Sequence, residues 1–349
     1  KMEEARVSMA SEPGKVRIVN QAEPPSNPVS PDIPRNIMMA LIIGAIIGFG
    51  INLAIEYFDN TVKSVEFIER KKLPVLGIIP SIKQVGEPYS KYSSKENGKK
   101  LSNRVANGRK SIGDLQRRLV THEDPKSPIS EAYRSLRTSL MYTKKGEKGT
   151  IMVSSPGPGE GKTTTIINLA ITYANLGKKT LLVDGDLRKP VLHKVFNGIN
   201  EIGLTHFLSG VEEKCESVIQ PTDIKNLNII YSGAIPPNPS ELLGSDLMKN
   251  MVPVLKDKYE VILFDAPPVM AVTDAVVLSR LIDQFILVVR FGSTDKDSID
   301  QTLTSLSHVN TYLTGIVLND LNRKNSYYSK NYYSYNNYYY STDEQSKII

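Results

Sequence analysis

One glycine-rich stretch combines the residue types that bind a nucleotide phosphate. It runs from Val153 to Thr165 and reads Val-Ser-Ser-Pro-Gly-Pro-Gly-Glu-Gly-Lys-Thr-Thr-Thr. Glycines let backbone N–H groups close around phosphate oxygens, and a helix N-terminus adds the positive end of its dipole. In this chemistry Lys162 reaches the β- and γ-phosphates, and the Thr163 hydroxyl binds Mg²⁺. The stretch is therefore a candidate phosphate-binding loop.

The loop departs from the pattern G-x-x-x-x-G-K-[ST] at its first glycine, where this chain has Pro156. Its core, from Gly159 to Thr163, is intact. An apolar run over 150–153 precedes the loop, and a helical pattern over 166–170 follows it. This order predicts a strand, a turn and the start of a helix, which is the context that a phosphate-binding loop requires.

Two further apolar runs end in aspartates. Asp184 and Asp186 follow the run 181–183, and Asp265 follows the run 261–264. A phosphoryl-transfer site needs carboxylates that hold Mg²⁺, and one that accepts the proton of the nucleophile. An aspartate at a strand end is often only a turn former. The presence of Lys162 in the same chain favours the catalytic interpretation for these three carboxylates.

From residue 129 to about residue 320, β-like runs alternate with helical ones. Such alternation predicts an α/β fold with a mostly parallel sheet covered by helices on both faces. Ligands of such sheets bind beyond the carboxyl ends of the strands, where the loop and both acidic motifs fall. The predicted strands are Thr150–Ser154, Thr180–Asp184, Leu227–Tyr231, Val261–Asp265, Phe285–Val289 and Gly315–Asn319.

The N-terminal part predicts a membrane anchor. Residues 1–35 are polar and proline-rich, and the run 37–55 contains no charged residue. That length crosses the hydrocarbon core as a helix, so we expect a transmembrane segment over 36–57. Lysines and arginines are more frequent after it, which predicts that the C-terminal side is cytoplasmic. A juxtamembrane segment over 58–80, with a short amphipathic helix over 59–72 and a strand-like run over 73–80, and a mobile linker over 81–128 follow.

Composition excludes several other classes of protein. The 349 residues allow about two domains. A single cysteine, Cys215, excludes an internal disulfide framework and a four-cysteine zinc site. The net charge of +6 is modest. It indicates no binding to nucleic acid, and at most a weak attraction to an anionic membrane surface.

The tail over 323–349 is rich in tyrosine and nearly free of aliphatic residues. Alone, this composition is also typical of an adhesive low-complexity tail. Beside a phosphoryl-transfer domain, a tethered tail of this kind is more readily explained as the substrate. The candidate acceptors are Tyr327, Tyr328, Tyr332, Tyr333, Tyr335, Tyr338, Tyr339 and Tyr340.

These motifs together resemble the Walker A, A′ and B motifs of the bacterial tyrosine kinases, the Wzc-like and CapB-like proteins of capsule and exopolysaccharide export. The A′ motif is Asp184-x-Asp186-x-Arg188, and the B motif is Asp265-x-Pro267-Pro268. Two further runs, 236–243 and 273–275, also resemble that family. The N-terminal part resembles the end of its Wzz-type chain-length-determinant region. By this resemblance a larger extracytoplasmic region and a first transmembrane helix are missing from the sequence.

The resemblance implies a P-loop domain of the MinD/ParA fold over 129–322 that binds ATP and Mg²⁺. It implies catalytic roles for Lys162, Asp184, Asp186 and Asp265, and leaves open how Asp184 and Asp186 divide metal binding and proton acceptance. Metal binding falls to Thr163 and these aspartates. Besides Lys162 and Thr163, the implied nucleotide-binding residues are Gly157, Gly159, Glu160, Gly161, Thr164, Arg188 and Asn319.

The resemblance also implies partners. Glu131, Arg134 and Arg137 form an E-x-x-R-x-x-R segment that in the family packs subunits into a ring, an octamer. A cognate phosphatase and the polysaccharide polymerase and export machinery follow by the same resemblance, as does a place in the bacterial inner membrane with the kinase domain and tail cytoplasmic. Two alternatives remain, an ATPase switch of the MinD/ParA type and a structural co-polymerase without tyrosine transfer. Gly157 stands where the MinD/ParA proteins carry a signature lysine, which disfavours the first.

Overall fold

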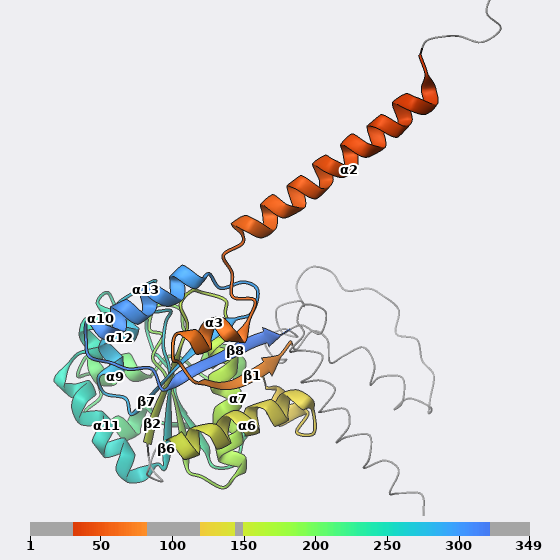
Figure 1. Cartoon of the computed structure of the whole chain (residues 1–349). Coiled ribbons are helices and arrows are strands. Elements are labelled where there is room, and N and C mark those ends of the chain that lie inside the picture. The colour runs from red at the N-terminus through yellow and green to blue at the C-terminus, as the bar shows by residue number, and fades with distance from the viewer. Residues whose placement is uncertain (1–30, 82–118, 144–148, 322–349) are drawn as a thin grey trace, which may run out of the picture. The chain divides into compact units, whose positions relative to one another are not determined.

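The structure, a computed structural model, describes residues 31–81, 119–143 and 149–321. The chain divides into two units, Lys1–Asp59 and Asn60–Ile349 (Figure 1). The proline-rich segment up to residue 30, most of the predicted linker and all eight tail tyrosines lie outside the described residues.

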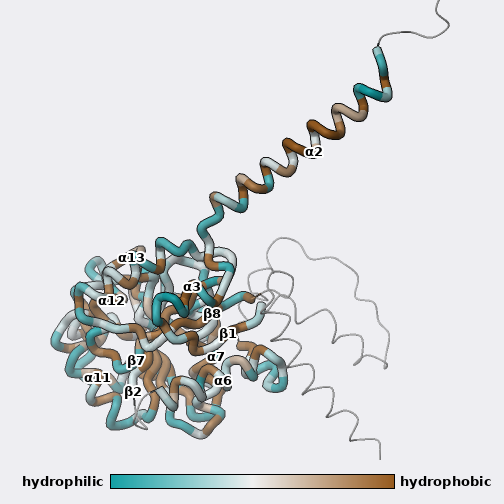
Figure 2. The backbone as a smooth tube through the Cα atoms, viewed as in Figure 1, coloured by the Kyte–Doolittle hydropathy of each residue, from teal (hydrophilic) through white to brown (hydrophobic). Residues whose placement is uncertain are grey.

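The described part of the first unit is one long helix, α2 (Ile33–Phe58). Pro34 lies in its first turn, where a missing N–H is tolerated, and the Asp32 carboxylate accepts a hydrogen bond from Arg35 N. The helix is apolar on all sides, with a mean hydropathy of 2.3 over its most apolar window. Figure 2 shows mostly brown and pale residues along the middle of α2 and teal, hydrophilic ones toward its ends. By length and composition α2 can cross a membrane.

The second unit is built on an eight-stranded sheet in the order β1-β8-β7-β2-β6-β3-β5-β4. All neighbours are parallel except the short edge strand β4, which runs antiparallel to β5. All six strands predicted from the sequence are present, which confirms the mostly parallel α/β fold. The bounds are β1 (Val75–Pro80), β2 (Gly149–Ser154), β3 (Thr180–Asp184), β4 (Gln220–Pro221), β5 (Leu227–Ile230), β6 (Val261–Asp265), β7 (Gln284–Arg290) and β8 (Gly315–Leu321).

Alternate strand residues face two separate cores, because successive side chains point to opposite faces of a sheet. On β6, Ile262 and Phe264 enter one core while Val261 and Leu263 enter the other. The helices α5 (Val120–Glu123), α6 (Pro128–Thr143), α7 (Lys162–Asn175) and α8 (Leu192–Val195) cover the second face. The first face is covered by α3 (Val65–Arg70), α9 (Leu204–Leu208), η3 (Cys215–Val218), α10 (Pro239–Leu243), α11 (Asp246–Lys258), α12 (Asp274–Ser279) and α13 (Lys296–Ser307).

Two segments that the sequence places outside the P-loop domain belong to this unit. The run 73–80 contains β1, which pairs with β8 and so forms one edge of the sheet. The helix expected over 59–72 is only the six-residue α3. Near residue 120, Thr121 is buried and donates its backbone N–H and its hydroxyl to the Asn168 side chain at 2.9 Å each. The sequence pattern places the start of the P-loop domain at residue 129. It misses β1 because the pairing of β1 with β8 joins residues that are far apart in the sequence.

The residues before α3 are held against the turn between β7 and α13. Val62 N donates to Thr294 O at 2.9 Å, and Gly292 N donates to Val62 O at 2.8 Å. Lys71 Nζ makes an ion pair with Asp300 at 2.6 Å. Val62 and Ile68 are fully buried in the core under α13. The juxtamembrane segment is thus a packed part of the domain.

Truncating Ile68 should therefore destabilise the domain. We expect Ile68→Ala to lower the free energy of unfolding by about 2–5 kcal/mol, since the methyl groups leave a cavity in a closely packed core. Arg70→Ala, on the exposed side of the same helix, is the matched control. The chain has no tryptophan, so melting would be followed by circular dichroism. Equal melting temperatures for the two variants would contradict the packing role.

Candidate active site

The glycine-rich loop joins β2 to α7, as the sequence predicts. Gly159 and Gly161 have φ angles of 79° and 98°, which favour glycine. Gly161 also lies against Asn319, and a Cβ at position 161 would come within 2.0 Å of Asn319 Nδ2. That amide donates to Glu160 O at 2.8 Å. Asn319, from the end of β8, therefore fixes the loop from the side.

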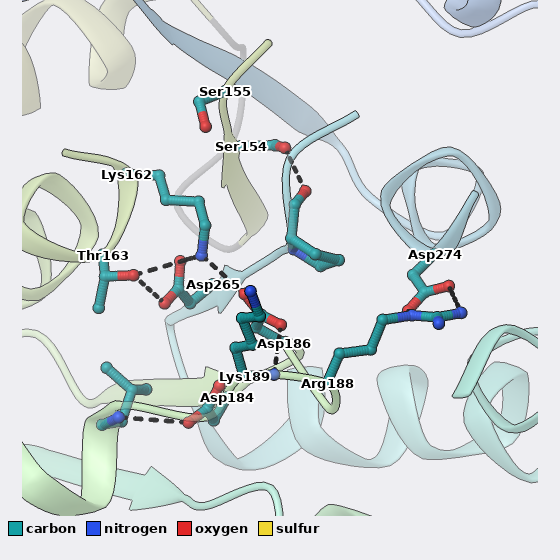
Figure 3. A network of polar contacts seen from close by, with 12 residues as sticks. Ser154, Ser155, Lys162, Thr163, Asp184, Asp186, Arg188, Lys189, Asp265 and Asp274 are labelled. Atoms are coloured by element: carbon teal, nitrogen blue, oxygen red, sulfur yellow. Dashed lines mark hydrogen bonds and ion pairs between the residues drawn. The ribbon is translucent and has the colours of Figure 1, made fainter. Parts of the chain in front are cut away.

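Lys162 brings the loop and the two acidic motifs together (Figure 3). Its Nζ lies 3.0 Å from Asp186 Oδ2 and 3.5 Å from Asp265 Oδ1. Burial by itself lowers the pKa of the Lys162 ammonium, but Asp265 and Asp186 outweigh it, and the net pKa is raised. Lys162 is thus held as a cation at the carboxyl ends of β3 and β6.

Thr163 and Asp184 complete the cluster. The Thr163 hydroxyl donates to Asp265 Oδ2 at 2.6 Å. Asp184 is fully buried, and its Oδ2 accepts from Leu192 N at 3.3 Å. Burial, the Asp265 charge and the Asp186 charge raise the pKa of Asp184 well above its usual range. Burial likewise raises the pKa of Asp265.

The cluster suits a cation that is additional to Lys162. Asp184 Oδ1 is buried and accepts no hydrogen bond from the described residues, while the buried Asp265 Oδ1 has the Lys162 ammonium at 3.5 Å. A buried carboxylate oxygen without a partner is costly, and a metal ion or its water would satisfy it. Among the described residues no three Asp, Glu, His or Cys form a ready-made metal site. Mg²⁺ takes few protein ligands and completes its shell with phosphate oxygens and water, and the carboxylates and the Thr163 hydroxyl present here are ligands of the type it prefers.

Glu160 is the buried acid of the loop itself. Its Oε1 accepts from Gly157 N at 3.1 Å, and the Thr294 hydroxyl also hydrogen-bonds to it. Burial raises the pKa of Glu160 to about 7. Both Gly157 and Glu160 were predicted to bind nucleotide, and here they contact each other. A charged Glu160 would repel phosphate, so the protonated form suits the loop better.

Arg188 contacts a residue to which the sequence analysis assigns no role. Its guanidinium donates to both carboxylate oxygens of Asp274, at 2.8 and 3.1 Å. Asp274 is fully buried and also accepts from Ser240 Oγ. Asp274 and Ser240 lie in the runs 273–275 and 236–243. Both runs resemble the family in sequence, but the sequence alone indicates no function for them and no contact with Arg188. The predicted contact of Arg188 with nucleotide stays a prediction.

The other predicted residues lie on α7 and α6. Thr164 is half-buried in the first turn of α7. Arg134 pairs with Glu131 and also donates to Pro125 O at 2.6 Å. Arg137 donates to Thr172 O at 2.7 Å. All three α6 residues remain partly exposed, and their proposed contacts with other subunits stay a prediction.

The pKa of Glu160 predicts a pH-dependent stability. A carboxyl whose pKa rises from 4.5 to about 7 on folding binds its proton more tightly in the folded state, so its stabilising contribution is full below about pH 4.5 and is lost as the pH rises to about 7. Glu160→Gln cannot ionise, so at pH 8 it should be more stable than the wild type by up to about 3 kcal/mol. Near pH 5 the difference should largely vanish.

The measurement is the melting temperature of both proteins between pH 5 and pH 8, without nucleotide. Glu69→Gln, at an exposed position on α3, is the control. A difference between Glu160→Gln and the wild type that does not change with pH would refute the assigned ionisation.

Family comparisons agree with this geometry. The AAA domain family matches residues 148–317, and the GNVR family, a G-rich domain, matches residues 1–56. The tyrosine-protein kinase YwqD of Bacillus subtilis is 38% identical over 213 residues, which is 60% of this chain and 90% of YwqD. The tyrosine-protein kinase etk of Escherichia coli is 31% identical over 331 residues, 94% of this chain but only 44% of etk. The chain thus spans less than half of that longer relative.

Solved structures give the same result. The kinase domain of Escherichia coli ETK has a TM-score of 0.64 at 28% identity, with 76% of this chain and 97% of that domain covered. The chimerical protein CapA2B2 has a TM-score of 0.61 at 33% identity, covering 74% of this chain and 100% of the chimera. The loop, the two acidic motifs and these similarities lead to one conclusion: the chain belongs to the bacterial tyrosine-protein kinase family.

Proposed function

We propose that the chain is a membrane-anchored protein-tyrosine kinase that transfers the γ-phosphate of ATP to the tyrosines of a C-terminal tail. One observation carries the proposal: Lys162, Thr163 and three aspartates converge at one edge of the sheet, in a chain that carries eight tyrosines within 327–340. By family membership we extend the proposal to transfer in trans within a ring of subunits. The role would be control of capsular or exopolysaccharide synthesis and export.

The residues of the active site would have separate roles in phosphate transfer. The loop N–H groups and Lys162 would bind and orient the phosphates, and Lys162 would offset the charge that develops on the transferred group. Thr163, Asp184 and Asp265 would hold Mg²⁺, which neutralises phosphate charge when bound. Asp186 contacts Lys162 and retains slight exposure, so it can approach a tyrosine hydroxyl and accept its proton. The fully buried Asp184 is less able to do so.

Anchoring follows from α2. Its length and apolar surface support a membrane span, and the excess of lysines and arginines after it supports a cytoplasmic catalytic unit. We therefore place the active site and the tail on the cytoplasmic side of the bacterial inner membrane. The cognate phosphatase and the polysaccharide machinery are expected partners of the whole protein.

Phosphopeptide mass spectrometry tests the proposal directly. The purified full chain would be incubated with Mg·ATP beside Lys162→Met. We expect phosphate on residues within 327–340 of the wild type and at least about 100-fold less on the variant, since the variant lacks the phosphate-orienting cation. An unmodified tail despite ATP turnover would contradict the kinase and support an ATPase switch.

The Asp274 network predicts a second effect. Asp274→Asn keeps the side-chain shape but removes the charge that holds Arg188, so the A′ loop and Asp186 should shift. We expect phosphate transfer to fall about 10- to 100-fold, as small misplacements of catalytic groups do, with little change in nucleotide affinity. Asp246→Asn, an exposed aspartate paired with Lys249, is the control. A loss of nucleotide affinity without a loss of transfer rate would contradict this positioning role.

A further inference from the structure

A pocket of about 550 Å³ lies beside the A′ loop. Its volume is within the range of about 300–1,000 Å³ that is typical of small-molecule sites. Two lysines and a histidine line it, and no carboxylate does. The lining residues are Lys189, Pro190, Val191, His193, Lys194, Asn200, Gly233, Ala234 and Ile235.

The strand order places this pocket on the β3 and β5 side of the active site, away from Asn319. Asn319 is on β8, the loop follows β2, Asp265 ends β6, and the A′ motif follows β3. The pocket lies between the segments that follow β3 and β5, at the far end of this series from Asn319. A nucleotide held by the loop and by Asn319 would leave the pocket free, next to the carboxylates that an acceptor hydroxyl must approach.

The walls of the pocket are fixed. The Asn200 amide donates to Gly233 O at 2.9 Å and accepts from Gly233 N at 3.0 Å, which joins the segment after α8 to the end of β5. Val191 and Ile235 add apolar surface, and Ile235 is exposed. An apolar wall of this kind suits an aromatic ring.

The polar groups of the pocket suit an anion. Lys189 N donates to Asp186 Oδ1 at 3.0 Å, so the pocket is tied to a catalytic carboxylate. The Lys189 and Lys194 ammonium groups have no partner among the described residues. His193 Nδ1 is buried and also lacks a hydrogen bond within the described part of the chain. The two ammonium groups are thus available to an anionic ligand.

We propose that this pocket binds the phosphorylated side chain of a tyrosine in the tail while a neighbouring tyrosine of the same tail occupies the acceptor position. The proposal rests on the proposed kinase function. The tail offers the ligand by its sequence, since tyrosines are adjacent at 327–328, 332–333 and 338–340. Each transferred phosphate adds about −1.5 to −2 charges to an aromatic ring. The pocket has the complementary charge and surface, so transfer to a tail that already carries one phosphate should be faster.

A binding experiment separates the pocket from the chemistry. The host is the full-length Lys162→Met chain, which leaves its own tail unmodified. The probes are two fluorescent peptides of sequence 326–340, one with phosphate on Tyr332 and one without. By fluorescence anisotropy at constant ionic strength, we expect the phosphopeptide to bind about tenfold more tightly, because it gains hydrogen bonds to charged groups.

Variants identify the pocket as the site. Adding Lys189→Gln and Lys194→Gln to the host should remove the tenfold preference, while the exposed control Lys225→Gln, at the opposite end of β5, should keep it. Equal affinity for the two peptides, or a preference that survives the double substitution, would overturn the proposal. If inorganic phosphate displaced the phosphopeptide as well as unlabelled phosphopeptide does, the aromatic ring would contribute nothing to binding, and that part of the proposal would be overturned.

The result does not depend on phosphate transfer. If the tail is never phosphorylated by Mg·ATP, the proposed function fails while the binding result still stands. If the tail is phosphorylated but the peptides bind equally, only the pocket proposal fails. In active protein, the double variant should add its first phosphate at the wild-type rate and later phosphates several-fold more slowly, as read from intact mass.

Discussion

Three buried or nearly buried carboxylates share one ammonium group at the carboxyl edge of the sheet. Asp184, Asp186 and Asp265 together carry more charge than Lys162 can offset. Two unit charges about 4 Å apart interact by roughly 4 kcal/mol at the effective dielectric of a protein surface. Burial, together with this excess of negative charge, raises the pKa values of Asp184 and Asp265. The site is therefore built to take up a further cation along with an anionic nucleotide.

The sheet imposes this crowding. β3 and β6 pair in register so that Asp184 faces Asp265, and Val153 at the start of the loop is also paired with Asp265. Gly185 permits the approach, because its N–H donates to Asp265 O at 2.8 Å and a Cβ there would lie 2.9 Å from that oxygen. A larger residue at position 185, between the two aspartates of the A′ motif, would collide with the Asp265 backbone, so glycine is required there for steric reasons. Because β2, β3 and β6 are parallel and end at the same edge of the sheet, the phosphate-binding loop, the A′ motif and the B motif come together in one site.

Sequence reasoning succeeded where a pattern is local. The loop, the six strands and the aspartates at strand ends follow from apolar runs and the residues that end them. It failed where the structure depends on distant partners. Nothing local in 73–80 shows that β1 pairs with β8, or that Asp274 receives Arg188 across 86 residues. The pocket at Lys189 was missed for the same reason, since Gly233 and Asn200 meet only in the fold.

Thr294 shows how such distant contacts connect the ends of the domain. Its carbonyl accepts from Val62 N, in the segment that follows α2 in sequence, and its hydroxyl hydrogen-bonds to Glu160 in the loop. Thr294 and Val62 are both buried, so neither can move without disturbing the packing around it. A displacement of the backbone at Val62 would therefore move the turn whose Thr294 hydroxyl hydrogen-bonds to Glu160. Two hydrogen bonds through Thr294 therefore join the juxtamembrane segment to Glu160 in the phosphate-binding loop.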